Sequence, residues 1–394
     1  MENRQTHTYY LPTYDECRAM CDANDNLIFN ETKHVVNGFD VSIFNYRLAQ
    51  WKDFENPLGD DSGVKAYELR GLTYVFNNDG TLYDRYLLLN KFFNIDQTPC
   101  SLYSVIKDLK IERIFNKEDG SIASFVKLPD GSVRAKSKAS FISDQAIGSQ
   151  RVYDTDDNIR RVVDYFLSKN IVPVFEYVSP DNKIVVPYSN TDLILLQLRD
   201  NRTGEYLDID DFQDILNGVS VVVTEDNTLD KLIELKDILE DKEGWVIQFE
   251  NGKMVKLKTK WYIDLHGLFT EELNRENLIF KMIFEETIDD ALALLGEDET
   301  SVYVKMTVNE INELLNFKIK KLYKEVMDFL DSEYDGDKKD FSLKHSKHKL
   351  FSLAIGVIND KDLVDMIKVL YEKQTRRLMD AQKWLEQAKM EYDG

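Results

Sequence analysis

The pattern of apolar and polar residues changes along the chain near residue 267. Before this point, short runs of β-branched and aromatic residues alternate with turn signals, which is typical of β-strands. Beyond it, apolar residues recur at spacings of three and four, which predicts amphipathic helices. The sequence therefore predicts an α+β fold, with antiparallel sheets and helices over 1–267 and an all-α region over 268–394.

Three turn sequences predict β-hairpins in the first region. Asn-Asp-Gly at 78–80, Pro-Asp-Gly at 129–131 and Glu-Asn-Gly at 250–252 each separate two strand-like runs, and such residues accept the positive φ of tight turns. Two more runs read as strands, "NIVPVFEYVSPDNKIVVPY" and "GVSVVVTED". Helices are expected over 156–169 and 228–241. The first should bury one face made of Ile159, Val162, Val163 and Phe166.

Two long helical patterns fill the second region. The first, over 309–334, has an apolar face formed by Ile311, Leu314, Leu315, Ile319, Leu322, Val326 and Phe329. The second, over 360–392, continues this spacing through Leu363, Ile367, Leu370 and Leu378. Between them, "SEYDGDKKD" at 332–340 predicts an exposed loop. All seven prolines lie at or before Pro187, so none interrupts these patterns.

Composition places the chain among ordinary globular proteins. It has 394 residues, of which 43% are hydrophobic and 11% aromatic, enough for two domains. No apolar run approaches the roughly 20 residues of a membrane helix, and "MENRQTHTYY" lacks the plan of a signal peptide. We expect a cytoplasmic protein with no membrane partner. Its cysteines, Cys17, Cys21 and Cys100, should be free thiols.

The net charge of −21 argues against a protein that coats nucleic acid indiscriminately. The net charge does not exclude local clusters of basic residues. Lys117 in "KEDG" raises the question of whether this lysine has a chemical role. The K-x-D-G pattern alone is weak evidence, because surface turns often hold a solvated lysine. Other charged residues beside strand-like runs strengthen the case: Arg70, Lys91, Lys138, Glu176, Glu243, Lys256 and Lys258.

Two of these positions do not fit a simple surface. Lys256 and Lys258 share one face of a strand, which requires an anionic neighbour if that face is covered. Glu176 lies within the apolar run "PVFEYV", where an unpaired carboxylate would be costly. Each position has a structural explanation of its own, such as an ion pair, but the ordered set describes one chemistry.

That chemistry is nucleotidyl transfer through a phosphoramidate. A lysine must be neutral to attack phosphorus, so its pKa has to fall by about 2–3 units from about 10.4. Neighbouring cations and partial desolvation lower the pKa of a lysine. The same cations would neutralise a triphosphate, and the carboxylates would hold a divalent metal and a ribose hydroxyl.

These motifs, in this order, resemble those of the bacteriophage RNA ligase 1 family of covalent nucleotidyltransferases over nearly the whole chain. "KEDGS" at 117–121 is similar to the nucleophile motif. The resemblance implies that Lys117 becomes linked to AMP and that Gly120 is a required turn residue. "LRGL" at 69–72 and "KFFN" at 91–94 imply nucleotide-binding roles for Arg70, Lys91 and Phe93.

The later motifs complete the resemblance. "KSKAS" implies a further essential lysine, Lys138, while "FEYV" and "EGWV" imply a ribose contact by Glu176 and a metal contact by Glu243. "KLKTKWYIDLH" at 256–266 implies phosphate-binding roles for Lys256 and Lys258 and a functional Tyr262.

One position departs from the family pattern. The family has a nucleotide-contacting tyrosine where "SIFNYR" places Phe44, with Tyr46 two residues later. A phenyl ring cannot donate a hydrogen bond, so the sequence leaves open whether Phe44 or Tyr46 takes this nucleotide-binding place.

The resemblance implies an ATP-dependent RNA ligase that uses Mg²⁺ and joins 5′-phosphate and 3′-hydroxyl RNA ends. Residues 1–267 would be the adenylyltransferase domain, and 268–394 a helical domain that selects RNA. The implied substrate is tRNA cleaved during phage infection, and we expect a monomer. "FKMIFEETIDDALAL" is similar to a family segment with a magnesium-linked acidic pair, here Asp289 and Asp290; a solvated helix face is an equal alternative.

Three other interpretations stay open. A capping-type guanylyltransferase or a DNA ligase would usually carry a β-barrel after the "KLK" motif, where this chain has a helical pattern. A catalytically silent RNA-binding protein on the same scaffold would not need every charged position. His345 and His348 in "KHSKHK" could bind metal, although without a third ligand an exposed basic patch that contacts RNA phosphate is favoured.

Overall fold

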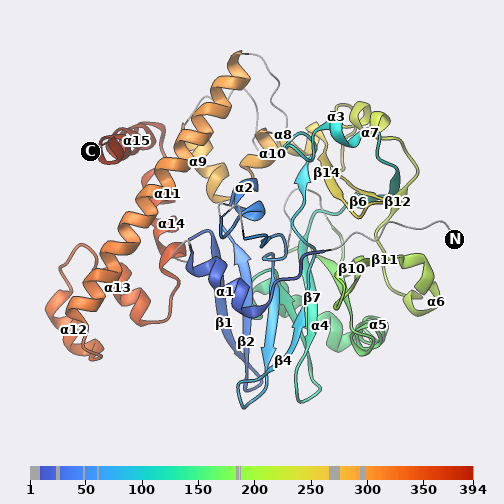
Figure 1. Cartoon of the computed structure of the whole chain (residues 1–394), viewed down its shortest axis with the longest axis horizontal. Helices are drawn as coiled ribbons and strands as arrows, with labels where there is room; N and C mark the ends of the chain where they lie inside the picture. Colours follow the sequence, from blue (N-terminus) through green and yellow to red (C-terminus); the bar gives the residue numbers. More distant parts are fainter. Residues whose placement is uncertain are drawn as a thin grey trace. The chain divides into compact units, whose positions relative to one another are not determined.

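The chain divides into two compact units, Met1–Gly267 and Leu268–Gly394 (Figure 1). This computed structural model describes residues 9–23, 27–47, 49–59, 62–182, 186, 188–265, 276–292 and 299–393. The first unit combines three sheets with helices, and the described part of the second consists of helices. The α+β fold class expected from the sequence, with antiparallel sheets and a helical C-terminal region, is confirmed.

The first sheet has four antiparallel strands in sequence order. Its strands are β1 (Phe29–Val36), β2 (Phe39–Tyr46), β3 (Leu72–Phe76) and β4 (Leu82–Tyr86). Asn37 and Gly38, with φ of 51° and 88°, form the tight turn between β1 and β2. This Asn-Gly turn was a hairpin signal that the sequence analysis did not use.

Two helices, α1 (Tyr14–Asp22) and α2 (Trp51–Glu55), contribute to the apolar cluster on one face of this sheet. Thr13 and Glu16 form a capping box at the start of α1. Cys17 and Cys21 are buried on this helix, and both are free thiols, as is the exposed Cys100. The expectation of free thiols is confirmed.

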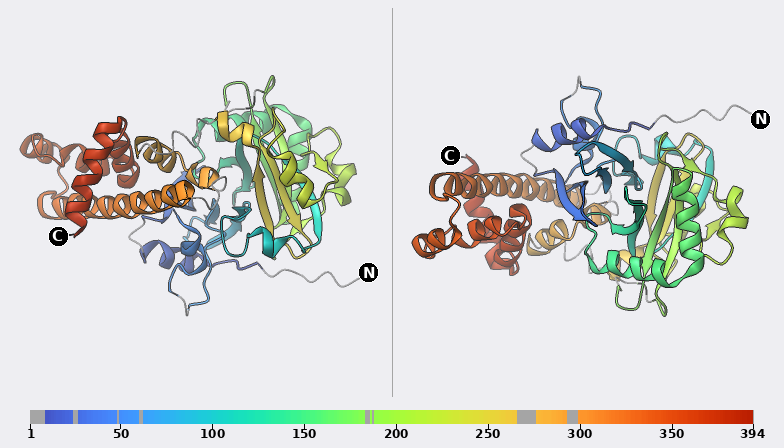
Figure 2. Two further views of the ribbon diagram at one scale, coloured as in Figure 1. Left: turned by 90° about the horizontal axis from the view of Figure 1, so that it is seen from above. Right: turned by 90° about the horizontal axis from the view of Figure 1, so that it is seen from below.

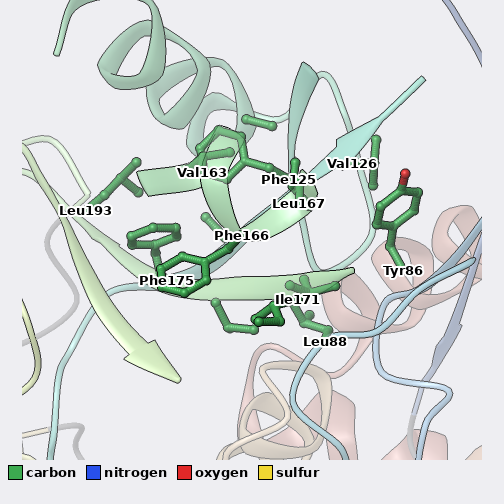
Figure 3. Packing of buried hydrophobic residues seen from close by; sticks show 14 of the residues in the cluster. Tyr86, Leu88, Phe125, Val126, Val163, Phe166, Leu167, Ile171, Phe175 and Leu193 are labelled. Carbon is green, nitrogen blue, oxygen red and sulfur yellow. The ribbon is translucent and has the colours of Figure 1, made fainter. Parts of the chain in front are cut away.

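The second sheet has the strand order β11-β10-β9-β7-β8. Its strands are β7 (Ser121–Lys127), β8 (Val133–Ser137), β9 (Ile171–Val178), β10 (Asp192–Asp200) and β11 (Tyr206–Leu207). The helices α4 (Asp144–Thr155) and α5 (Asp157–Ser168) pack on this sheet (Figure 2). Phe166 of α5 meets Phe125 and Phe175 of the strands in the main core (Figure 3).

The third sheet has the strand order β12-β6-β13-β14-β5, and only its β14–β5 pair is parallel. Its strands are β5 (Phe93–Asn94), β6 (Ile111–Lys117), β12 (Thr224–Glu225), β13 (Gly244–Phe249) and β14 (Met254–Lys258). A separate core forms around the fully buried Trp245. The short helices of this unit are α3 (Tyr103–Ile106), η1 (Ile209–Phe212), α6 (Gln213–Leu216), α7 (Leu229–Leu235) and α8 (Lys260–Leu265).

The structure confirms the three hairpins predicted from turn sequences and the helix α5 with its buried face. Other predictions need correction. In "GVSVVVTED" only Thr224–Glu225 and a bridge from Val221 to Leu195 are strand-like, and the helix predicted over 228–241 ends at Leu235. The β10 strand was not predicted, and residues 183–185 and 187 of the "NIVPV" run lie outside the described residues.

The second unit packs its helices around the long helix α11. Its helices are α9 (Glu276–Phe284), α10 (Ile288–Leu292), α11 (Glu299–Glu333), α12 (Lys338–His345), α13 (Phe351–Ile358), α14 (Leu363–Gln374) and α15 (Leu378–Asp393). Ile311, Leu315 and Val326 of α11 are buried, as their spacing predicted. No helix in the described part of either unit is long and apolar enough to span a membrane.

Two predictions for the second unit were wrong in detail. The pattern over 360–392 is broken at Thr375, whose φ of −106° and ψ of 10° leave helical geometry, so α14 and α15 are separate helices. Leu378 is 36% exposed. The loop expected over 332–340 is shorter, because α11 extends to Glu333 and α12 begins at Lys338 after its Asp337 cap.

Candidate active site

Lys117 ends strand β6, where the chain passes from the third sheet to the second. The next three residues form a turn, and β7 then begins at Ser121. At Gly120, a Cβ atom would lie 2.5 Å from Tyr177 O of the neighbouring strand β9, so only glycine permits this approach. Gly120 N–H donates a hydrogen bond to Glu176 Oε1 (3.1 Å). The turn thus fixes Lys117 at the junction of two sheets, beside Glu176.

Glu243 lies between two lysines. It directly precedes Gly244, which pairs with Lys117 on β6 and with Lys258 on β14. Glu243 Oε1 lies 2.7 Å from Lys117 Nζ and 2.9 Å from Lys258 Nζ. The Glu243 side chain is only 3% exposed, whereas that of Lys117 is 25% exposed. The sequence analysis expected cations around Lys117, and the structure adds a buried carboxylate that bridges it to one of them.

Glu176 is the second carboxylate of the site. Burial raises the pKa of its carboxyl group to about 8, and the charge of Glu243 acts in the same direction. Lys117, Arg70 and the Gly120 N–H oppose this shift by favouring the charged form. The charges of Lys117, Arg70 and Glu243 therefore all influence the pKa of Glu176. These four predicted residues lie close enough to interact electrostatically.

The turn after Lys117 is held by a buried hydrogen-bond network around Asp119. Tyr262 OH donates to Asp119 Oδ1 (2.7 Å), and Val186 N–H donates to Oδ2 (2.6 Å). Asp119 N–H in turn donates to Tyr188 OH (3.0 Å). Lys258 Nζ lies 4.7 Å from the centre of the Tyr262 ring. Tyr262, predicted to be functional by resemblance, thus supports the Lys117 turn.

Two members of this network were missed in the sequence analysis. Asp119 is the fixed acid of K-x-D-G, and that pattern was the signal that could have found it. Tyr188 also donates to Glu118 Oε2 (2.9 Å), but it lies 70 residues further along the chain and no local pattern marks it.

A second group of cations surrounds Tyr46. Lys91 Nζ and Lys138 Nζ each lie 4.9 Å from the centre of the Tyr46 ring, and Lys91 Nζ is 3.3 Å from Tyr46 OH. Lys91 Nζ also lies 5.1 Å from the ring of Phe93, which is buried on β5. Lys91, Phe93 and Lys138, predicted separately, therefore belong to one cluster of cations and aromatic rings.

Phe44 does not belong to this cluster. Its side chain is fully buried and its ring packs edge-on against Tyr14 and Tyr74. Phe44 and Tyr46 share a face of β2, but only Tyr46, at the end of the strand, reaches the lysines. The expectation that Phe44 contacts a nucleotide is therefore corrected: a ring enclosed in the core has no surface to offer a ligand.

Arg70 and Lys256 complete the set. The Arg70 guanidinium lies 5.6 Å from the Phe92 ring, and its buried Nη1 has no hydrogen-bond partner within the described part of the chain. A buried, unsatisfied cationic donor fits an anionic ligand. Lys256 pairs with Asn94 in the parallel β14–β5 ladder, so it borders the segment that carries Lys91.

A buried lysine beside the Arg70 turn had no assigned role. Lys136 is 2% exposed, and its Nζ donates to Gly71 O (2.9 Å). Burial lowers the pKa of Lys136 to about 7. Gly71 has a φ of 87°, and a Cβ there would lie 2.7 Å from Lys138 O. The Lys136 contact therefore supports a turn that only glycine can form.

The acidic pair and the histidines lie in the second unit. Asp289 is part of α10, while the side chain of Asp290 is outside the described residues; their metal role stays a prediction. In the described residues no three His, Cys, Asp or Glu side chains form a group that could hold a metal.

The expected exposed patch at the histidines is corrected in part. The His348 ring stacks on Phe329 at 4.1 Å, and His345 packs against Phe329 and Phe341. Both rings therefore take part in packing, and the side chain of His345 is only 16% exposed.

Comparisons with known proteins give matches over both units. A family model described as RNA ligase matches residues 68–262, the range that runs from the Arg70 turn to Tyr262. A curated protein of Thermovibrio ammonificans, described as "Putative RNA ligase", is 26% identical over 322 residues, which cover 78% of this chain and 80% of that protein. The RNA ligase of Rhodothermus phage RM378 is 24% identical over 203 residues, 43% of this chain and 46% of that protein.

Solved structures resemble this chain more distantly. An archaeal ATP-dependent RNA ligase has a TM-score of 0.44 at 13% identity, over 74% of this chain and 76% of that chain. An RNA ligase of Naegleria gruberi has a TM-score of 0.35 at 17% identity, over 45% of this chain and 58% of that chain.

The matched segment contains the predicted site residues from Arg70 through Lys117 and Glu176 to Tyr262. Fold, site and sequence matches together define a protein of the nucleotidyltransferase class. This chain is similar to RNA ligases over residues 68–262, and its enzyme class is RNA ligase.

Proposed function

We propose that this RNA ligase uses ATP and that Lys117 is its nucleophile. The Lys117 amine attacks the α-phosphorus of ATP, so that an N–P bond forms and pyrophosphate leaves. An oxygen of an RNA 5′-phosphate then attacks the same phosphorus, breaking the N–P bond and transferring AMP to the RNA end. Finally an RNA 3′-hydroxyl attacks the activated 5′-phosphate and AMP leaves.

One observation carries this proposal. Lys117 Nζ lies at the junction of two sheets, 2.7 Å from a buried Glu243 that also binds Lys258. A surface-turn lysine would not need such a neighbourhood. Burying a carboxylate with two lysines is costly unless the arrangement has a use, and nucleotidyl transfer is the use that fits this set of charges.

The ion pair also suggests how the nucleophile is released. Lys117 Nζ is paired with the Glu243 carboxylate, whereas attack on phosphorus needs a neutral amine with a free lone pair. Lys258 can retain Glu243 when Lys117 moves away, because both lysines share the same Oε1 atom. We propose that nucleotide binding separates Lys117 from Glu243 and so frees the Lys117 amine for attack.

The remaining cations fit the binding of a nucleotide triphosphate. Arg70, with its unsatisfied Nη1, and the lysines 91, 138, 256 and 258 supply donors for phosphate oxygens. Glu176, with a pKa of about 8, is largely protonated near neutral pH and can hydrogen-bond a ribose hydroxyl. We propose Tyr46 in place of Phe44 as the aromatic residue that meets the nucleotide, because its ring lies among these lysines.

A divalent cation such as Mg²⁺ fits this site if substrate phosphates provide most of its ligands. Glu243 is the buried carboxylate that would hold it, which agrees with the preference of Mg²⁺ for one or two carboxylates plus phosphates. When bound, the cation would neutralise charge on the triphosphate and the leaving pyrophosphate. Asp289 and Asp290 are proposed as a further acidic pair.

The proposed substrate is tRNA cleaved during phage infection, as the family resemblance implies. The second unit, 268–394, is proposed to select the RNA, since the residues proposed to bind ATP lie in the first unit. Its basic segments "KHSKHK" and "KQTRR" can contact phosphates, which position RNA and make affinity salt-dependent. We propose that the enzyme acts as a monomer.

The proposal is tested by incubating the protein with ATP or GTP labelled at the α-phosphate. A labelled protein with ATP alone is the expected result, and acid-labile, alkali-stable label would mark a phosphoramidate. Label from GTP alone would indicate a capping-type enzyme, and no label from either would favour a silent RNA-binding scaffold. Comparing the sealing of a nicked tRNA stem-loop with that of linear single-stranded RNA would then test the proposed substrate.

A further inference from the structure

The far edge of the second sheet holds the turn that carries Arg70. Arg199, near the end of β10, is fully buried and pairs with Glu68 through Nη1 to Oε2 (2.7 Å) and Nη2 to Oε1 (2.6 Å). Arg70 N–H donates to Glu68 O (2.6 Å). The ion pair is therefore anchored two residues from Arg70.

The same edge holds the loop that carries Lys91. Tyr206 OH on β11 donates to Asn90 Oδ1 (2.6 Å) and accepts from Asn90 N–H (3.1 Å). Arg199 Nη1 donates in addition to Leu88 O (2.5 Å) in this loop. Asn90 is the residue directly before Lys91, so the Tyr206 hydroxyl fixes the backbone from which Lys91 projects.

Arg199 and Tyr206 act as one unit. The Arg199 guanidinium lies 4.9 Å from the centre of the Tyr206 ring, and its Nε donates to Gly204 O (2.9 Å) in the turn between β10 and β11. The positive charge of Arg70 also acts to lower the pKa of the Tyr206 phenol. A single pair of side chains thus contacts both loops.

This pair does not touch the proposed nucleotide site directly. On β9, Val172 pairs with Arg199 and Glu176 pairs with Ile194. Glu176 lies four positions after Val172, which corresponds to about 13 Å along a strand. The same sheet therefore carries Glu176 near one end and holds the Arg70 and Lys91 loops at the other.

A buried ion pair is a poor source of stability, because the cost of removing both charges from water offsets their attraction. What it supplies is geometry. A guanidinium with two parallel bonds to a carboxylate fixes both distance and orientation, and so does a tyrosine hydroxyl that both donates to and accepts from one asparagine.

We propose that Arg199 and Tyr206 are positioning residues for adenylylation, which set Arg70 and Lys91 relative to Lys117 through Glu68 and Asn90. This inference rests on the proposed function in so far as Arg70 and Lys91 bind the triphosphate. Small displacements of such groups weaken binding without removing the nucleophile.

The test is Tyr206→Phe, which removes the hydroxyl and keeps the ring on Arg199. We expect the KM for ATP in lysyl-AMP formation to rise about fivefold while kcat stays within about twofold, the pattern of weakened ground-state binding. Hydrogen exchange of the amides in 87–92 should accelerate by about tenfold or more, since the Asn90 N–H loses its acceptor. The matched control is Tyr153→Phe, which removes a phenol bonded to Asp164 (2.7 Å) on the helices α4 and α5 and should change neither quantity.

A second variant, Arg199→Lys, keeps the charge and loses the two-bond geometry, and should raise the KM for ATP further. Thermal melting will show whether Arg199→Lys folds. If it does not fold, the KM for ATP of Tyr206→Phe alone tests the proposal. An unchanged KM in Tyr206→Phe overturns the proposal, whether or not amide exchange accelerates. If the wild-type protein forms no lysyl-AMP, the proposed function fails, and unchanged exchange in 87–92 would then separately overturn the positioning of the Lys91 loop.

Discussion

The two units of this chain treat charged side chains in opposite ways. In the described part of the first unit, six charged residues are buried: Arg47, Glu68, Asp119, Lys136, Arg199 and Glu243. In the described part of the second unit no charged residue is buried, and Thr375 is its one buried polar side chain. Some ion pairs of the second unit, such as Lys389 with Glu310, join half-exposed side chains.

The second unit is built mainly for stable packing, whereas the first unit also positions charged groups for chemistry. The second unit packs apolar and aromatic side chains, for example Phe280, Tyr371 and Trp384, and its exposed ion pairs contribute little. The first unit buries charges at a cost, and two of them, Asp119 and Glu243, lie in the Lys117 site. Substitutions of buried charges in the first unit should therefore impair adenylylation, whereas substitutions of the exposed charges of the second unit should leave adenylylation and stability nearly unchanged.

The largest effect is expected for Lys117→Ala, which should abolish the protein–AMP adduct. The alanine variant lacks the nucleophile, and because the side chain is 25% exposed the fold should persist. Labelling with α-labelled ATP and circular dichroism check both points. Lys107→Ala, an exposed lysine of the same unit, is the control. Wild-type levels of adduct in the Lys117 variant would end the proposed mechanism.

The next largest effect should follow removal of a phosphate-facing lysine. Lys258→Ala removes one partner of Glu243 as well as a proposed phosphate donor, and adenylylation should slow about 100-fold. Lys256→Ala should act in the same direction. Lys253→Ala, on the same β13–β14 hairpin, serves as control because Lys253 bonds to Cys100 O outside the site. Normal rates of adenylylation and of sealing pre-adenylylated RNA in either site variant would contradict this assignment.

A smaller effect on ATP chemistry is expected when residues 268–394 are deleted. The first unit has cores of its own, so adenylylation should fall by no more than about threefold. The preference for tRNA-like over linear RNA should fall by about tenfold, and the salt dependence of sealing should weaken. Labelling and sealing assays over a salt series measure both. Loss of labelling, or an unchanged substrate preference, would refute this division of labour.

The smallest effect concerns pH. The pKa of Glu176 is raised from 4.5 to about 8 in the folded protein, so between these values the folded state holds a proton that the unfolded state has lost. The free energy of unfolding contributed by this group therefore falls as pH rises from about 4.5 to 8. Glu176→Gln cannot ionise and should therefore gain stability relative to wild type as pH rises from 5 to 8.5.

The gain should appear as a rise in the Tm of Glu176→Gln relative to wild type, by about 2–4 °C per kcal/mol for a domain of this size. Thermal melts at the two pH values measure it, with the exposed Glu234→Gln as control. An equal difference between wild type and Glu176→Gln at both pH values would show that Glu176 is not held neutral.

Short-range signals in the sequence account for much of the fold. Turn residues predicted the hairpins β3–β4, β7–β8 and β13–β14 because positive φ is a local property. The apolar spacing of α5 and α11 predicted their buried faces for the same reason. The second long pattern was predicted less well, because apolar spacing alone did not reveal that the backbone leaves helical geometry at Thr375.

The sequence by itself determined which residue types stand at the candidate site and in which order, from Arg70 to Tyr262. Only the tertiary structure decided how they meet. Phe44 and Tyr46 have the same local pattern, yet packing encloses one and leaves the other beside Lys91 and Lys138. Glu243 bridges two lysines because strand register brings Gly244 opposite both, and Arg199 reaches Glu68 across 131 residues of chain. Such contacts arise from the pairing and packing of distant segments, whose energies depend on the whole fold and leave no periodic trace in the sequence.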